Sequence, residues 1–181
     1  SKKLDLKEVY CGLDCQMLLY LFSLTRDAGG RFTGAQPAGV LYLLADPAPQ
    51  TLPREQAARA VEYQLDGLVR DEQKIFDAMD ADETGKNLPF GYRNGAPSPY
   101  QKDKRADSAK LSRIQLHLDD LVTQMGEQLY GGQIDAEPLV VSSSKSPCTW
   151  CDYSFICCHE TGIGERALEA PAKPFEPEET E

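Results

Sequence analysis

The sequence predicts an α/β protein that carries a cysteine-based metal site near its C-terminal end. Three features support this prediction: an amphipathic helical stretch followed directly by a short apolar strand, a second long amphipathic helix, and a cluster of cysteines beyond that helix. A helix next to a buried strand is typical of layered α/β folds. Because 181 residues can bury a core without disulfides, the cysteines need another explanation.

The composition predicts a soluble, cytoplasmic protein without a membrane span. Hydrophobic residues make up 41% and charged residues 27% of the chain, and no apolar run approaches the ~20 residues that a spanning helix needs. The opening SKKLDLKEVY has no apolar stretch after its charges, so nothing indicates export. The net charge of -10 argues against a free-standing nucleic-acid binder, but half of it lies after residue 159, where seven glutamates face two basic residues.

The N-terminal half predicts a helix, a strand and further helix. Apolar residues at three- and four-residue steps predict one helix from about Asp5 to Leu24. The run PAGVLYLLADP lies between prolines and is rich in Val, Leu and Tyr, which predicts a buried strand. From Pro53 to Asp80 the pattern is helical with a break at Gly67, and Asp71 is the expected N-cap of a helix through EQKIFDAMD.

The C-terminal half predicts a long loop, a long helix and an acidic tail. Residues 81–107 are rich in Gly, Pro and charge, which predicts a loop. A clean apolar stripe then predicts a helix from an N-cap at Ser108 to the stop at Gly131. His117 lies beside the stripe and is expected to be solvated or partly packed rather than a ligand. Residues 161–181 are rich in Pro and Glu and are expected to be solvated.

Residues 146–160 form a predicted metal-binding cysteine knuckle. Cys148, Cys151 and Cys157 have the spacing C-x2-C-x5-C, which can bring three thiolates round one zinc ion or iron–sulfur cluster. A reducing compartment also favours metal ligation over disulfides. Three ligands do not close a tetrahedral site, and a residue adjacent to a ligand rarely reaches the same metal. The candidates for a fourth ligand are therefore the adjacent Cys158 and His159 and the distant Cys11 and Cys15.

Two motifs in this chain resemble a nuclease family. LDLKEVYCGLDCQMLLYLFSL followed by PAGVLYL is similar to a segment of the AddB subunit of bacterial AddAB helicase–nucleases, which belong to the RecB-like branch of the PD-(D/E)XK nucleases. CTWCDYSFICCHE resembles the C-terminal cysteine knuckle of that family. The resemblance implies that residues 1–160 are the C-terminal portion of a PD-(D/E)XK nuclease domain, with a helix carrying Q-x3-Y, a buried strand and further helices.

The resemblance also implies roles for particular residues. Gln16 and Tyr20 match the family's Q-x3-Y motif, which supports the nuclease site. Cys148, Cys151 and Cys157 match the last three ligands of the family's [4Fe-4S] cluster, whose first cysteine comes from far upstream. In the family this cluster is a structural staple. The implied activity is that of a metal-dependent DNA exonuclease subunit in double-strand break repair, with an AddA-type helicase subunit and DNA as partners.

The chain departs from the family pattern at its start. The acids that bind Mg²⁺ and the catalytic lysine of these nucleases lie just upstream of the first helix, so this chain is expected to be an inactive fragment. Asp5 and Glu8 are read as helix N-terminal charges. Two alternatives remain open: a non-catalytic, zinc-stapled module that binds DNA or protein, and a thiol redox protein that uses the C-x2-C pair.

Overall fold

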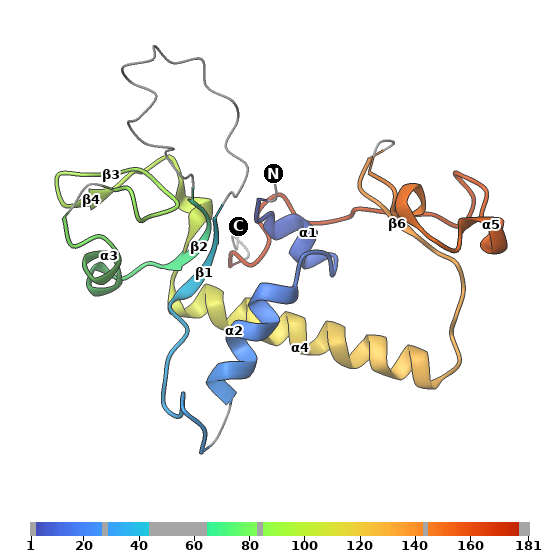
Figure 1. Ribbon diagram of the computed structural model, residues 1–181, viewed down its shortest axis with the longest axis horizontal. Coiled ribbons are helices and arrows are strands. Elements are labelled where there is room, and N and C mark those ends of the chain that lie inside the picture. The colour runs from blue at the N-terminus through green and yellow to red at the C-terminus, as the bar shows by residue number, and fades with distance from the viewer. Residues whose placement is uncertain (1–2, 27–28, 44–64, 83–84, 143–144, 178–181) are drawn as a thin grey trace, which may run out of the picture. The chain divides into compact units, whose positions relative to one another are not determined.

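The computed structural model describes residues 3–26, 29–43, 65–82, 85–142 and 145–177 (Figure 1). The chain divides into two compact units. The first contains residues 1–5 and 15–115, and the second contains residues 6–14 and 116–181. The architecture is mixed α/β, as predicted. No helix in the described ranges is long and apolar enough to cross a membrane.

The first unit contains a three-stranded mixed sheet. Its strand order is β1-β2-β5, with β1 (Gly39–Leu43) antiparallel to β2 (Leu65–Arg70) and β5 (Arg105–Ala106) parallel to β2. Helix α2 (Gln16–Arg26) lies against β1. The core of this unit includes fully or nearly fully buried residues of the sheet, of α2 and of the first part of α4: Leu18, Phe22, Val40, Leu68, Leu111 and Ile114.

A smaller apolar cluster of the first unit joins β2 to the segment that follows it. Phe76 of α3 (Gln73–Met79) packs with Val69, Leu88, Phe90 and Tyr92. The rings of Phe76 and Phe90 meet edge to face at 5.2 Å, a favourable geometry for aromatic pairs. Residues 81–107 are therefore not one uniform loop, because their described part contains β3 (Tyr92–Arg93), β4 (Ala96–Pro97), the 3-10 helix η1 (Lys102–Lys104) and β5.

The second unit is built on helices and short irregular elements. It contains α1 (Leu6–Tyr10), residues 116–130 of α4 (Ser108–Tyr130), and the parallel pair β6 (Leu139–Val140) and β7 (Arg166–Ala167). The 3-10 helix η2 (Pro147–Trp150) and α5 (Ser154–Cys157) complete it. Val9 of α1 and Leu118 of α4 are buried to 1% exposure or less.

The predicted single helix from Asp5 to Leu24 is two helices. Helix α1 ends at Tyr10, and α2 begins at Gln16. Gly12 and Asp14 between them have φ values of 85° and 52°, which a right-handed helix does not allow. The Leu13 amide donates to the Glu8 carbonyl at 2.8 Å and closes the turn. Apolar spacing continues across this turn, so periodicity alone did not reveal it.

The strand predicted within residues 37–47 is confirmed, but it is only partly buried. Within β1, Val40 is buried, whereas Leu41 and Leu43 are 36% and 58% exposed. The reason is that β1 is an edge strand of the described sheet, and only one of its faces lies on the core.

The prediction of helix from Pro53 to Asp80 is wrong at residues 65–70, which form β2, the most buried strand of the sheet. Residues 53–64 lie outside the described ranges. Asp71 is not a helix cap either: Glu72 occupies that position without a side-chain cap bond. The Asp71 carboxylate instead accepts two hydrogen bonds from Arg105 Nη1, at 3.0 and 3.1 Å.

The predicted long helix is confirmed as α4, which begins at Ser108 and ends at Tyr130. The side chain that caps it is Asp107, because Asp107 Oδ1 accepts from the Lys110 amide at 2.6 Å. The tail differs from the expected solvated segment, since Phe175 is only 8% exposed and β7 pairs with β6.

Candidate functional site

Gln16 and Tyr20 form a pair on the exposed side of α2. The spacing of four residues places them one turn apart on the same side of the helix. Gln16 Nε2 donates a hydrogen bond to Tyr20 Oη at 2.9 Å. Both side chains are exposed, with Tyr20 at 56%, whereas Leu18 and Phe22 of the same helix are buried. The α2 helix therefore presents an amide and a phenol together to solvent, held by the packing of its opposite side.

The cysteine knuckle consists of two short turns in the second unit. The first is η2, where Pro147 occupies an early position and Ser146 Oγ accepts from the Cys148 amide at 3.3 Å. The Cys151 amide then donates to the Cys148 carbonyl at 3.4 Å, which closes a tight turn between these two cysteines.

The second turn of the knuckle is α5, which carries Cys157. The Cys157 amide donates to the Tyr153 carbonyl at 2.9 Å. The helix ends at Cys158, whose φ of 52° is left-handed. Such a conformation commonly terminates a helix. Local backbone hydrogen bonds therefore define both turns without any help from a metal.

The thiols of the knuckle are accessible but do not converge. All six cysteines are thiols rather than disulfides, with Cys148 half-buried and Cys151 and Cys157 exposed. Across the described ranges, no group of three or more His, Cys, Asp or Glu side chains is arranged to hold a metal ion. The donor types suit zinc or an iron–sulfur cluster, but their arrangement does not fit either group as it stands. The metal site stays a prediction.

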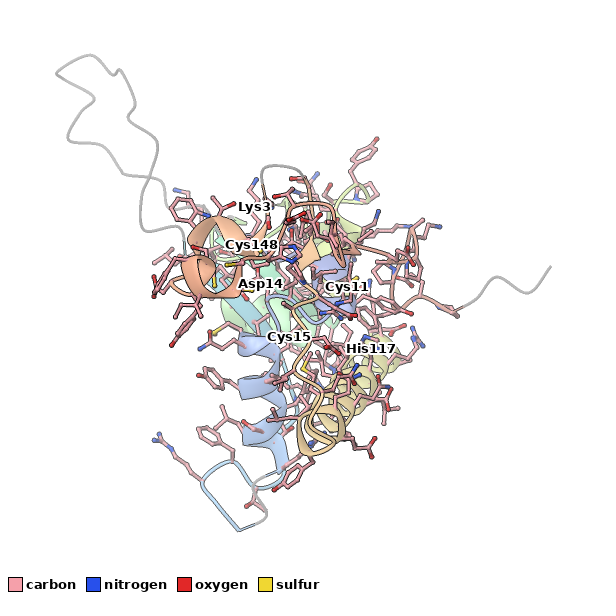
Figure 2. All side chains as sticks on the ribbon, turned by 90° about the vertical axis from the view of Figure 1, so that its right-hand side faces the viewer. Lys3, Cys11, Asp14, Cys15, His117 and Cys148 are labelled. Atoms are coloured by element: carbon pink, nitrogen blue, oxygen red, sulfur yellow. The ribbon has the colours of Figure 1, made fainter. Side chains whose placement is uncertain are left out.

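Two cysteines outside the C-x2-C-x5-C set donate thiol hydrogen bonds to backbone carbonyl groups. Cys11 Sγ donates to the Glu169 carbonyl at 3.5 Å. Burial raises the pKa of the Cys11 thiol, and the hydrogen bond with the Glu169 backbone offsets part of that rise. A raised pKa disfavours the thiolate, which is the form that binds metals and reacts. Cys158 Sγ is 3.9 Å from the Phe155 carbonyl oxygen, to which it donates. Figure 2 labels Cys11 and Cys148, which come from different elements of the second unit.

The apolar residues around the knuckle do not form a mini-core or a sheath in the described part of the chain. They are strongly exposed, with fractions of 86% for Trp150, 71% for Tyr153, 76% for Phe155 and 67% for Ile156. Clustered exposed apolar side chains often mark interaction surfaces. The sequence had left open a sheath round a cluster or a small hydrophobic mini-core, because spacing does not reveal exposure.

Glu8 has a structural role that agrees with its predicted reading. Its carboxylate is 3.3 Å from Lys145 Nζ, which ties α1 to the segment before the knuckle within the second unit. Glu8 lies in the first turn of α1, as predicted, and in addition makes an ion pair that the sequence did not predict.

Asp66 is an important residue that sequence reasoning missed. Its carboxylate is 6% exposed in β2 and accepts from the Leu4 amide and from Lys104 Nζ, each at 2.6 Å. These bonds join three segments of the first unit that are far apart in sequence. The sequence of β2, LDGLVR, does not alternate apolar and polar residues, so no sequence signal marked Asp66 as buried.

Comparison with known proteins gives the family. No protein-family model matches the chain. AddB of Bacillus subtilis (strain 168), a subunit of an ATP-dependent helicase/deoxyribonuclease, is 32% identical over 179 residues, which cover 91% of this chain. The chain is a relative of AddB. The AddB proteins of Bacillus velezensis and of Thermoanaerobacter sp. (strain X514) are 32% and 28% identical and match 94% and 90% of the chain.

The similarity to AddB involves nearly all of this chain but only a small part of its relatives. The matched segment is 15% of the length of the AddB proteins from Bacillus subtilis and Thermoanaerobacter sp., and 16% of that from Bacillus velezensis. The family resemblance seen in the two motifs is thus confirmed along nearly the whole chain.

Proposed function

We propose that this chain supplies the C-terminal part of a PD-(D/E)XK nuclease domain in an AddB-type subunit. The exposed Gln16–Tyr20 pair on α2 is the observation that carries this proposal. The relatives are named helicase/deoxyribonuclease subunits, which supports DNA as the substrate and an AddA-type helicase as the partner. The proposed setting is the cytoplasm, during repair of double-strand breaks.

In this proposal, the pair on α2 positions the reacting groups. Tyr20 Oη accepts from Gln16, so its O–H remains available to donate to a phosphate oxygen of the DNA. The hydrogen bond between them restricts both side chains, which lowers the entropy lost when the substrate binds. When bound, Mg²⁺ activates the attacking water and offsets the developing negative charge. The acids that hold Mg²⁺ are proposed to come from another segment of the subunit, so the 181-residue chain is inactive.

Changing the pair is expected to reduce DNA cleavage by the complete AddB-type subunit with its helicase partner. Gln16→Leu and Tyr20→Phe each remove one member of the hydrogen bond and are expected to lower the nuclease rate by about 10- to 100-fold. The ATPase rate of the complex should stay unchanged. Gln124→Leu is the matched control, because the Gln124 side chain also donates a hydrogen bond to a residue one helical turn away, Asp120 on α4. Full nuclease activity in both α2 variants would contradict the proposal.

We further propose that Cys148, Cys151 and Cys157 are three ligands of a [4Fe-4S] cluster in the complete subunit. Three accessible thiols on two short turns support this, because thiolates are the ligands that such clusters use. The fourth thiolate is proposed to come from a distant cysteine of the same subunit. Such a cluster would hold the knuckle to that distant segment as a structural staple.

Iron content tests the cluster. In anaerobically purified complete subunit, about four irons per chain and a brown colour are expected. Cys148→Ser, Cys151→Ser and Cys157→Ser should each lose most of the iron, whereas Cys158→Ser should retain it. Stoichiometric zinc in a colourless protein would contradict the cluster and would show that the knuckle holds a zinc ion instead.

A zinc-stapled binding module is the second candidate function. The four strongly exposed apolar residues of the knuckle favour it, because they form a surface suited to a protein partner. In that case the Gln16 and Tyr20 variants would leave nuclease activity intact, and the knuckle would hold zinc.

A further inference from the structure

The tail contains two buried residues inside an exposed segment. Pro174 and Phe175 are buried, while their neighbours at 171–173 and at 176–177 are exposed. Phe175 also has a φ of 66°, a left-handed conformation that is unfavourable for a bulky side chain. An aromatic residue held in this conformation needs compensating contacts, so the burial of Phe175 is a specific feature of the tail.

Tyr10 and His117 supply those contacts and form what we call the aromatic slot. The two rings stack at 4.6 Å with an angle of 14° between their planes, and His117 Nε2 is 2.8 Å from the Tyr10 carbonyl oxygen. The Phe175 ring lies 5.3 Å from His117 and 5.6 Å from Tyr10, tilted against both. These are the edge-on geometries that aromatic rings prefer. The slot and its occupant all belong to the second unit, and Figure 2 labels His117 on α4.

The tail makes a second contact with the end of α1. The Glu169 carbonyl accepts from Cys11 Sγ at 3.5 Å, and Cys11 directly follows α1. Residues 169–176 therefore contact the α1 region at both of their ends, through Cys11 and through Tyr10. We call this segment the strap.

We propose that the aromatic slot is a recognition site for a Pro–aromatic pair in an extended acidic peptide, and that the strap is its intramolecular occupant. Pro174 has a restricted φ, so ordering the segment costs little entropy. The strap carries Glu169 and Glu176 beside Lys173, which makes it net acidic. With Phe175 in the slot, the Glu169 carbonyl lies within hydrogen-bond reach of the half-buried Cys11 thiol. This proposal stands apart from the proposed nuclease function.

Alkylation of Cys11 in the 181-residue chain measures whether the strap is closed. Phe175→Ala is expected to raise the rate of iodoacetamide modification at Cys11 by about threefold or more, because the strap then opens more often. Cys148 serves as the internal reference in the same mass-spectrometric experiment. Phe155→Ala is the matched control, since Phe155 is 76% exposed and should leave the Cys11 rate unchanged. An unchanged rate in Phe175→Ala, with helix content preserved, would overturn the proposal.

Peptide rescue tests recognition by the slot. The Phe175→Ala chain is mixed with a synthetic peptide of residues 170–181, up to about millimolar concentration. The peptide is expected to shift the His117 ring signals in NMR, and a longer peptide that begins at Glu169 is expected in addition to slow Cys11 alkylation toward the parent rate, because the Glu169 carbonyl contacts the Cys11 thiol. A peptide with the same Phe175→Ala change should do neither. Absence of rescue, or equal rescue by both peptides, would show that the slot does not recognise this pair.

Discussion

A chain with Gly67→Ala is expected to lose a large part of its folding stability. Gly67 lies in β2 opposite Leu41, with a φ of 148°. A Cβ at this position would lie 2.1 Å from the Val40 carbonyl oxygen and 3.0 Å from the Leu41 Cα. Both atoms belong to the backbone of β1, so the clash is relieved only by separating the two strands. The expected loss is about 3 kcal/mol or more in the free energy of unfolding.

Gly95→Ala is the matched control for this prediction. Gly95 also has a positive φ, at 72°, but a Cβ there meets nothing within 4 Å. The control thus measures the conformational penalty alone, which is about 1 kcal/mol. Urea unfolding of both variants gives the comparison, and equal losses would show that β1 and β2 do not approach each other as closely as the structure has them.

Loss of the Asp66 carboxylate is expected to be about as damaging. In Asp66→Ala, the Leu4 amide and the Lys104 ammonium both lose a 2.6 Å hydrogen bond. The Lys104 side chain is only 18% exposed, so water replaces the lost partner poorly. A buried charge left without its partner typically costs about 3 kcal/mol.

Two further variants separate this buried charge from general surface effects. Asp103→Ala removes a carboxylate from an exposed residue of η1 and is expected to change stability by less than about 0.5 kcal/mol. Asp66→Ala combined with Lys104→Met should be more stable than Asp66→Ala alone, because no unpaired charge remains. If Asp66→Ala unfolds at the same urea concentration as Asp103→Ala, the carboxylate does not join the segments as described.

Helix α4 and the helical region of Gln16 were predictable because their signals are local. The stripe of α4 repeats every three to four residues over 23 residues, and a stop at two glycines follows it. The pairing of Gln16 with Tyr20 follows from helix geometry alone, since residues four apart are neighbours on any helix. The two motifs also led to the AddB family, which similarity along nearly all of this chain to known AddB proteins confirms.

The wrong predictions have two physical origins: contacts between segments distant in sequence, and local backbone conformations that apolar spacing does not encode. β2 has only six residues, LDGLVR, too few for periodicity to distinguish a strand from a helix, and its pairing with β1 and β5 decides its conformation. The break between α1 and α2 depends on backbone conformations at Gly12 and Asp14 that the apolar stripe does not encode.

The sequence by itself determined the class of the protein, its family, the long helix and the composition of the knuckle, because composition, periodicity and motif spacing are properties of neighbouring residues. Only the tertiary structure decided which side chains are buried: Asp66 against Leu4 and Lys104, and Phe175 against Tyr10 and His117. Burial depends on contacts between segments that are far apart in sequence. The sequence of one segment alone does not give the free energy of its packing against another.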